Sequence, residues 1–265
     1  MTTTQETFIS HLVELRQRLV NAIIAVGVLF VALFVYPGSG PIYDALAMPL
    51  IHALPQGTKM IATGVVTPFL VPMKVTAMVA LFIALPYVLY QAWAFVAPGL
   101  YENEKKLALP LIVGSTVLFF LGVAFCYFFV FVRVFTFIHQ FAPKSITPAP
   151  DIEAYFSFVI TMFLAFGITF EIPIIVIVLV RMGIVEVEKL RAARPYVIVG
   201  AFIVAAIVTP PDVISQIMLA LPMCLLYEAG LFFGRFVAAR AKQAQEGDQP
   251  MTDEEMESEL DRTDR

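Results

Sequence analysis

A short charged stretch, residues 95 to 106, lies between two of the longest apolar runs in the chain. Pro98 ends the preceding helix, because it has no backbone N–H to continue one. Glu102 and Glu104 follow, next to two lysines. At a membrane edge, where the dielectric is lowered, a carboxylate accepts the forked hydrogen bonds of a guanidinium group. The chemistry offered here is therefore ionic recognition; the alternative is that Glu104 pairs with the neighbouring lysines.

Two other side chains are candidates for the same kind of site. Phe95 offers an aromatic face that receives apolar groups or stacks on a guanidinium, and the alternative is an anchor at the membrane interface. Glu14 lies four residues before Arg18, the favourable order for an intrahelical ion pair worth about 0.2–0.5 kcal/mol. At this point that ion pair and a binding role for Glu14 both stay open.

Glu171 is the one ionisable residue well inside a long apolar run, and Pro173 follows closely. A charge at such a depth costs about 3 kcal/mol on insertion scales, and protonation or a hydrogen bond relieves the cost. Three roles are open: a structural bond to another span, acceptance of a polar side chain from a partner helix, or proton carriage. The last has least support, because one isolated carboxyl forms no relay.

Signatures of enzymes are scarce. The chain has no G-x-S-x-G, H-E-x-x-H or G-x-x-x-x-G-K-[ST] pattern, and His11, His52 and His139 fall on segments assigned to both sides of the membrane. Cys126 and Cys224 lie in apolar runs, which argues against a structural disulfide. We therefore expect no enzyme, no metal site and no cofactor.

The composition is that of a membrane protein crossing the bilayer several times. Hydrophobic residues make up 60% of the chain and charged residues 14%, and the mean hydropathy is +0.85. The net charge of −4 does not describe the membrane part of the chain, because residues 246–265 alone hold nine acids and two arginines. We expect two regions: a transmembrane domain over residues 1–235, with an amphipathic amino-terminal segment, and a largely disordered acidic tail over residues 236–265.

The apolar pattern predicts an all-α protein with six spans. Their approximate ranges are 19–36, 76–95, 107–132, 154–180, 196–208 and 213–233. Before the first span, apolar residues at intervals of four, three and four predict a helix lying along the interface. Breakers mark the expected turns and bends, namely Pro49 within short outer helices, a kink at Pro86, and turns at Pro98, Pro210 and Asp212.

The last two spans are predicted to be short. Residues 196–208 give only about 20 Å of helix, against a hydrocarbon core of about 30 Å. Gly230 and Gly234 match the small-xxx-small pattern, which is typical of tight local packing, and the same glycines also permit the close approach of a partner helix. We therefore expect these helices to form a docking edge for partner helices, with Met218 and Leu225 as contact positions.

Basic residues near the predicted span ends are distributed eleven to four between the two sides. This asymmetry places both termini in the cytoplasm. The spans show no internal repeat, which weakens a reading as an inverted-repeat transporter. A proton-coupled secondary transporter of a small solute, with Glu171 as the proton carrier, is nevertheless kept as the alternative function.

Several motifs in order resemble one family over nearly the whole chain: HLVELR from His11, WAFVAPGL from Trp93, FEIP from Phe170, RPY from Arg194 and TPPD from Thr209. The chain resembles the TatC subunit of the twin-arginine protein translocase. The resemblance implies six spans in a cupped arrangement in the cytoplasmic (inner) membrane. It also implies a receptor for twin-arginine signal peptides that works with TatA and TatB, and with further copies of itself, to move folded proteins by the proton-motive force.

The resemblance also implies roles for particular residues. The family's signal-peptide contacts match Phe95 and Glu104, with Glu14 and Arg16 adjoining, and its polar residue in the fourth span matches Glu171. Glu102 departs from the family pattern, so no role is carried onto it. Nothing indicates a nucleic-acid partner.

Overall fold

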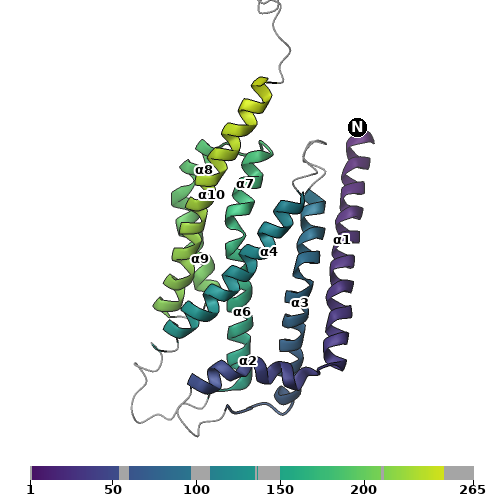
Figure 1. Cartoon of the computed structure of the whole chain (residues 1–265), viewed down its shortest axis with the longest axis vertical. Coiled ribbons are helices and arrows are strands. Elements are labelled where there is room, and N and C mark those ends of the chain that lie inside the picture. The colour runs from purple at the N-terminus through teal and green to yellow at the C-terminus, as the bar shows by residue number, and fades with distance from the viewer. Residues whose placement is uncertain are drawn as a thin grey trace, which may run out of the picture.

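The computed structural model describes residues 2–53, 60–96, 108–134, 136, 150–209 and 212–247. Over these ranges the chain is helical, apart from turns and one isolated parallel bridge between Ile61 and Asp151. In chain order the helices are α1 (Thr2–Val35), α2 (Ser39–Ala53), α3 (Thr67–Val96), α4 (Ala108–Phe125), η3 (Cys126–Val130), α6 (Ile152–Phe170), α7 (Ile172–Arg181), α8 (Val187–Ala192), α9 (Arg194–Val208) and α10 (Val213–Gly247). The prediction of an all-α polytopic protein is confirmed (Figure 1).

Within the described ranges, five segments are long and apolar enough to cross a membrane: Ile9–Val35, Thr67–Phe95, Leu109–Val134, Ile152–Arg181 and Val213–Val237. The predicted fifth span corresponds to α9, an apolar helix of 15 residues. At 1.5 Å per residue, α9 is about 22 Å long and is short, as predicted. The sixth helix is longer than predicted, because α10 has 35 residues. It continues into the segment assigned to the acidic tail, and residues 248–265 lie outside the described chain.

The amino-terminal segment and the first span form one helix. Figure 1 shows α1 as a single rod beside α3, so the prediction of a separate helix along the interface is wrong. No proline interrupts this segment, and the Glu14–Arg18 pair supports a continuous helix. α1 lies at the edge of the bundle, with its span unburied by the rest of the chain.

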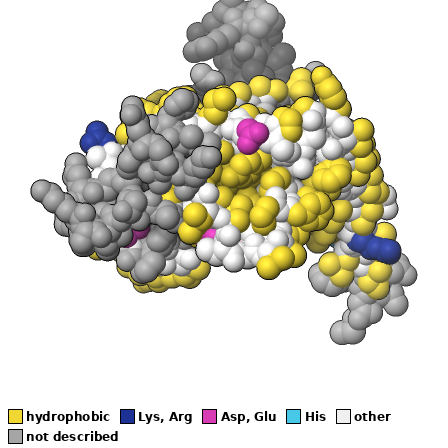
Figure 2. Space-filling model, turned by 90° about the horizontal axis from the view of Figure 1, so that it is seen from below, with side chains coloured by type: hydrophobic (Ala, Val, Ile, Leu, Met, Phe, Trp, Pro, Cys, Tyr) yellow, Lys and Arg dark blue, Asp and Glu magenta, His cyan; other side chains and the backbone are white. Residues whose placement is uncertain are grey.

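One predicted proline effect is absent from the described backbone. α2 is one helix that runs through position 49, so the break expected at Pro49 is not seen; the side chain of Pro49 lies outside the described residues. α3 continues through Pro72 and Pro86 as one helix, and the kink at Pro86 stays a prediction. It also starts at Thr67, well before the predicted start, and Pro68 fits there because a helix needs no N–H donor in its first turn. Seen from the end where α2 lies, the surface is largely apolar with scattered charges (Figure 2).

α4 and α6 cross at a glycine on each helix. A methyl group built on Gly122 of α4 would lie 2.5 Å from the backbone oxygen of Phe166, and one built on Gly167 of α6 would overlap the ring of Phe119. Phe166 is fully buried and Phe119 nearly so. Small residues let membrane helices approach closely without bulky side chains between them. The two glycines therefore set the distance between α4 and α6.

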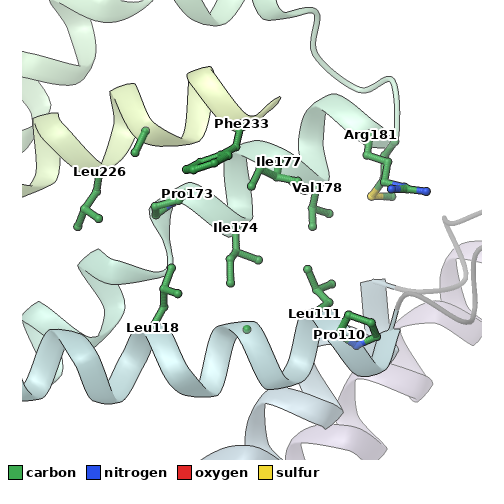
Figure 3. A pocket seen from close by; sticks show the side chains of 13 residues that line it. Pro110, Leu111, Leu118, Pro173, Ile174, Ile177, Val178, Arg181, Leu226 and Phe233 are labelled. Atoms are coloured by element: carbon green, nitrogen blue, oxygen red, sulfur yellow. The ribbon is translucent and has the colours of Figure 1, made fainter. Parts of the chain in front are cut away.

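An apolar cavity of about 510 Å³, the α4–α10 groove, lies between α4, α7 and α10. Figure 3 shows Pro110, Leu111 and Arg181 towards one end of the groove and Leu118 and Leu226 towards the other. Arg181 is the one charged residue among those that line it.

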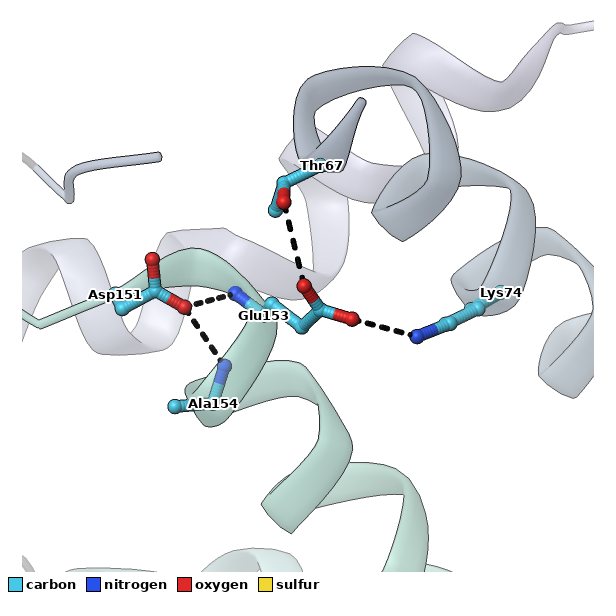
Figure 4. A network of polar contacts seen from close by, with 5 residues as sticks. All are labelled: Thr67, Lys74, Asp151, Glu153 and Ala154. Atoms are coloured by element: carbon cyan, nitrogen blue, oxygen red, sulfur yellow. Dashed lines mark hydrogen bonds and ion pairs between the residues drawn. The ribbon is translucent and has the colours of Figure 1, made fainter. Parts of the chain in front are cut away.

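At the end of the bundle where α2 lies, a polar network joins α3 to α6 (Figure 4). Asp151 caps α6 by accepting hydrogen bonds from the amides of Glu153 and Ala154, at 2.9 and 3.0 Å, and from the Thr63 hydroxyl at 2.7 Å. Glu153 accepts from Lys74 at 2.9 Å and from the Thr67 hydroxyl at 3.2 Å. We call these contacts the Asp151 network. The amide of Ala154 and the Thr63 donors hold the pKa of Asp151 below its usual value.

Candidate functional site

The amino-terminal segment and the end of α3 meet at an aromatic contact. The rings of His11 on α1 and Phe95 on α3 stack with centroids 4.3 Å apart and an interplanar angle of 22°. The two residues are far apart in sequence, and they belong to different sequence motifs. One face of Phe95 is therefore covered by His11, and the side chain stays half-buried. The placement of Phe95 at the last turn of α3 agrees with the prediction.

Glu14 lies one helical turn after His11 and is the acid of a small charged group. Its carboxylate accepts hydrogen bonds from Arg18 Nε at 2.9 Å and Nη2 at 2.6 Å, and its other oxygen lies 3.8 Å from His11 Nδ1. The intrahelical ion pair is thus present. Arg16 lies on the same helix with an exposed side chain. We call His11, Glu14, Arg18 and Phe95 the His11–Phe95 cluster.

The charge of this cluster bears on recognition. Arg18 balances the charge of Glu14, so the cluster holds an oriented carboxylate but no net negative charge while His11 is neutral. A cationic ligand binds a site better when a further carboxylate is close. Glu104 is the sequence candidate, and it lies outside the described residues, as do Pro98 and Glu102.

Glu171 lies where the fourth span breaks. The span predicted as one helix is divided into α6 and α7, and Glu171 is the residue between them. Pro173 stands in the first turn of α7, where its missing N–H is tolerated. The proline was visible in the sequence, but a proline within an apolar run predicts either a kink or a break.

The Glu171 side chain is 8% exposed. Among the described residues, neither carboxyl oxygen has a hydrogen-bond partner within ordinary geometry, although the Ser115 hydroxyl lies near the group. Ser115 itself accepts a hydrogen bond from Trp93 Nε1 at 2.9 Å. Polar side chains from three elements therefore lie close together here: Trp93 from α3, Ser115 from α4 and Glu171 from the α6–α7 break. A buried polar group without a partner in a native protein calls for an explanation, and a bound water, a proton or a side chain of a partner helix would each supply one.

Sequence comparisons agree on one family. The profile described as "Sec-independent protein translocase protein (TatC)" matches residues 10–222. The "Sec-independent protein translocase protein TatC" of Escherichia coli (strain K12) is 48% identical over 241 residues, which cover 91% of this chain and 93% of that protein. The protein of the same name from Haemophilus influenzae is 51% identical over 231 residues, covering 87% of this chain and 90% of that one.

The chain belongs to the TatC family. It is therefore a component of the twin-arginine protein translocase and a multi-pass membrane protein. A solved structure, "Crystal Structure of Twin Arginine Translocase Receptor- TatC", superposes with a TM-score of 0.76 at 37% identity, covering 86% of this chain and 99% of that chain. The TatC fold accounts for the arrangement of helices described above.

The residues named for a docking edge on α10 differ in their exposure, and the edge itself stays a prediction. Leu225 is 63% exposed, whereas Met218 is half-buried and packs against the core. The two glycines face inward: a methyl group built on Gly230 would lie 3.0 Å from the Cα atom of Pro173, and Gly234 also faces α7. The interpretation of these glycines as a sign of tight local packing is therefore confirmed, because they serve the packing of α10 on α7 and do not contribute to an outer docking edge.

The remaining turn residues divide between described and undescribed positions. Asp212 accepts a hydrogen bond from the Ser215 amide at 2.6 Å and so caps α10, as a turn residue should. Pro210 lies outside the described residues. Cys126 is buried and Cys224 half-buried, and both are free thiols. Across the described parts of the chain, no three His, Cys, Asp or Glu residues gather as a metal site would require.

Proposed function

We propose that this TatC-family subunit binds twin-arginine signal peptides at the end of the bundle where α1 meets α3. The supporting observation is the His11–Phe95 stack, which joins the amino-terminal segment to the last turn of α3 at 4.3 Å. Phe95 is also the point from which the chain leaves towards Glu104. The candidates named from the sequence on α1 and α3 therefore lie at one end of the molecule.

Two guanidinium groups require carboxylate acceptors. Glu14 is oriented by Arg18 and supplies one acceptor, which the ligand shares with Arg18. Glu104 supplies the second, with a charge-assisted pair worth about 1.5–3 kcal/mol. Phe95 receives the apolar part of the peptide on the face that His11 leaves uncovered. The positive charge of Arg16 repels the arginines of the peptide unless the Arg16 side chain is turned towards water. Arg16 therefore helps to position the peptide and does not contact the peptide's arginines.

Binding of a fluorescent twin-arginine peptide to the purified protein tests this assignment. We expect Glu104→Gln to weaken binding about tenfold or more, since 1.4 kcal/mol is a factor of ten, and Glu104→Asp to retain part of the affinity. Glu102→Gln is the matched control, because it removes the same charge two positions away; it should change binding little. A twin-lysine peptide should bind less well to wild type. Equal binding to wild type and Glu104→Gln at several salt concentrations would remove Glu104 from the site.

We also propose that TatA- and TatB-type helices dock along α9 and α10, where α9 is shorter than the hydrocarbon core and Leu225 faces outward. Glu171 accepts a polar side chain from an incoming helix, which would give a partner to a buried carboxyl that has none within ordinary geometry among the described residues. The complex uses the proton-motive force to move folded proteins across the inner membrane. Both termini lie in the cytoplasm, as the basic residues indicate.

Glu171 variants separate docking from proton carriage. Glu171→Gln keeps hydrogen bonding and should largely preserve transport, whereas Glu171→Ala should impair cysteine crosslinks from Leu225 to TatB and leave signal-peptide binding intact. Ser115→Ala, which removes the nearest hydroxyl, is the control for a purely local effect. An inactive Glu171→Gln variant with normal partner crosslinks would overturn docking and favour proton carriage.

The secondary transporter is the second candidate, and its single support is the buried Glu171. Membership of the TatC family favours the translocase. Transport of a small solute by the chain reconstituted without partners would reverse this preference.

A further inference from the structure

The α4–α10 groove holds apolar side chains along its length and one cation at one end. Arg181 is the last residue of α7, and Figure 3 shows its side chain at the end of the groove where Pro110 and Leu111 begin α4. At the far end Leu118 and Leu226 face the groove. A binding site of this form is amphiphilic: it takes a long apolar body with one anionic head.

The length of the groove matches one leaflet of a bilayer. Pro110 and Leu118 are eight residues apart on α4, which is about 12 Å along the helix axis. Half of a hydrocarbon core is about 15 Å. Arg181 then lies at the level of the lipid headgroups, because it ends the apolar segment of α7.

The volume also restricts the occupant. The groove has a volume of about 510 Å³. Cavities of about 300–1,000 Å³ suit small, mostly apolar ligands. A single extended hydrocarbon chain enters such a groove lengthwise.

The positive charge of Arg181 favours an occupant with an anionic headgroup. A guanidinium group forms forked hydrogen bonds with phosphate oxygens. Arg181 is the charged residue that lines the groove, and the segment that follows it, residues 182–194, carries three basic and two acidic side chains. An anionic headgroup is favoured over a zwitterionic one by about 1 kcal/mol for each basic group near the membrane surface.

We propose that the α4–α10 groove binds one acyl chain of an anionic glycerophospholipid, with the lipid phosphate at Arg181. Gly114 leaves the middle of the groove open. A methyl group built on Gly114 would lie 3.6 Å from Ile174 Cδ1, an ordinary contact, so alanine fits there and a larger side chain fills the space.

The experiment uses the full-length protein in phosphatidylcholine vesicles that contain a small fraction of photoreactive phospholipid, with the reactive group on the acyl chain. Phosphatidylglycerol and phosphatidylcholine probes with identical chains are compared, and labelled peptides are mapped by mass spectrometry. The variants are Gly114→Leu, with Gly114→Ala as its control, and Arg181→Gln, with Arg235→Gln as its control. Arg235 is an exposed arginine on α10 that does not line the groove.

We expect the phosphatidylglycerol probe to label α4, α7 and α10 about fivefold more than the phosphatidylcholine probe, the effect of one basic group. Gly114→Leu should abolish this labelling and Gly114→Ala should not. Arg181→Gln should remove the preference for phosphatidylglycerol, and Arg235→Gln should keep it. Labelling that is equal for both probes and insensitive to Gly114→Leu would overturn the proposal. So would crosslinking of an added signal peptide or partner helix within the groove together with loss of lipid labelling. If Gly114→Leu fails to fold, the comparison of Arg181→Gln with Arg235→Gln still tests the proposal, and an unchanged preference for phosphatidylglycerol in Arg181→Gln would overturn it.

Discussion

Gly122 offers the most direct test of the packing between α4 and α6. Replacing it with alanine adds one methyl group, and that methyl would lie 2.5 Å from the backbone oxygen of Phe166 and 2.9 Å from the Phe170 ring. Carbon atoms in good contact are about 3.5–4.0 Å apart. A ring can turn aside, but a backbone oxygen cannot, so the two helices must separate by about 1 Å.

The magnitude follows from two opposing terms. Overpacking a well-packed core costs about 1–3 kcal/mol, and the upper end applies because the obstacle is backbone. Alanine in place of glycine within a helix returns about 1 kcal/mol. The net loss is about 2 kcal/mol, which lowers the melting temperature by about 4–8 °C for a protein of this size.

Thermal unfolding in detergent, followed by size-exclusion chromatography of heated samples, measures the change. All variants are heated at one rate, because unfolding of such proteins is often irreversible. Gly27→Ala on α1 is the matched control, since a methyl group there meets nothing within 4 Å; it should melt at or above the wild-type temperature. Gly167→Ala should be rescued by Phe119→Leu, which removes the obstructing ring atoms. A Gly122→Ala protein as stable as Gly27→Ala would refute the reasoning.

Two further predictions concern the ends of α3. The pKa of Asp151 is lowered in the folded protein, so its contribution to stability is full above the ordinary carboxyl value of 3.8 and is lost as pH falls through the folded value; Asp151→Asn should therefore flatten the loss of thermal stability on acidification below about pH 4, and an unchanged acid profile would exclude the capping role. Phe95→Leu keeps an apolar side chain but loses the stack on His11, worth about 0.5–1.5 kcal/mol, so it should weaken signal-peptide binding without lowering the melting temperature by more than a few degrees; His11→Ala should reproduce part of the binding loss if the stack orients Phe95, and wild-type affinity in both variants would contradict that orientation.

The sequence predicted the spans well, because hydrophobic length is a local property. α9 was short as expected, and Phe95 and Glu171 were placed at the end and in the middle of spans. The contact between His11 and Phe95 could not be predicted from the sequence. The two residues are 84 positions apart, and a contact over that distance produces no local sequence pattern. Pro173 indicated a disturbance of the helix near Glu171, but it did not show whether this would be a kink or a break. The glycine pattern at Gly230 indicated tight packing, which the structure shows, but a glycine does not reveal which helix approaches it.

For a tilt of α3 as a rigid rod, the Asp151 network is the natural pivot. It fastens α3 to α6 near Lys74 by bonds between residues 79 and 88 positions apart, while Phe95 lies at the opposite end of the same helix. The 21 residues from Lys74 to Phe95 make a lever arm of about 32 Å. With the network as pivot, a tilt of about five degrees displaces Phe95 by about 3 Å, roughly the length of one hydrogen bond. The travel of α3 is therefore smallest at the threonines and carboxylates that anchor it and largest at the aromatic ring that meets α1.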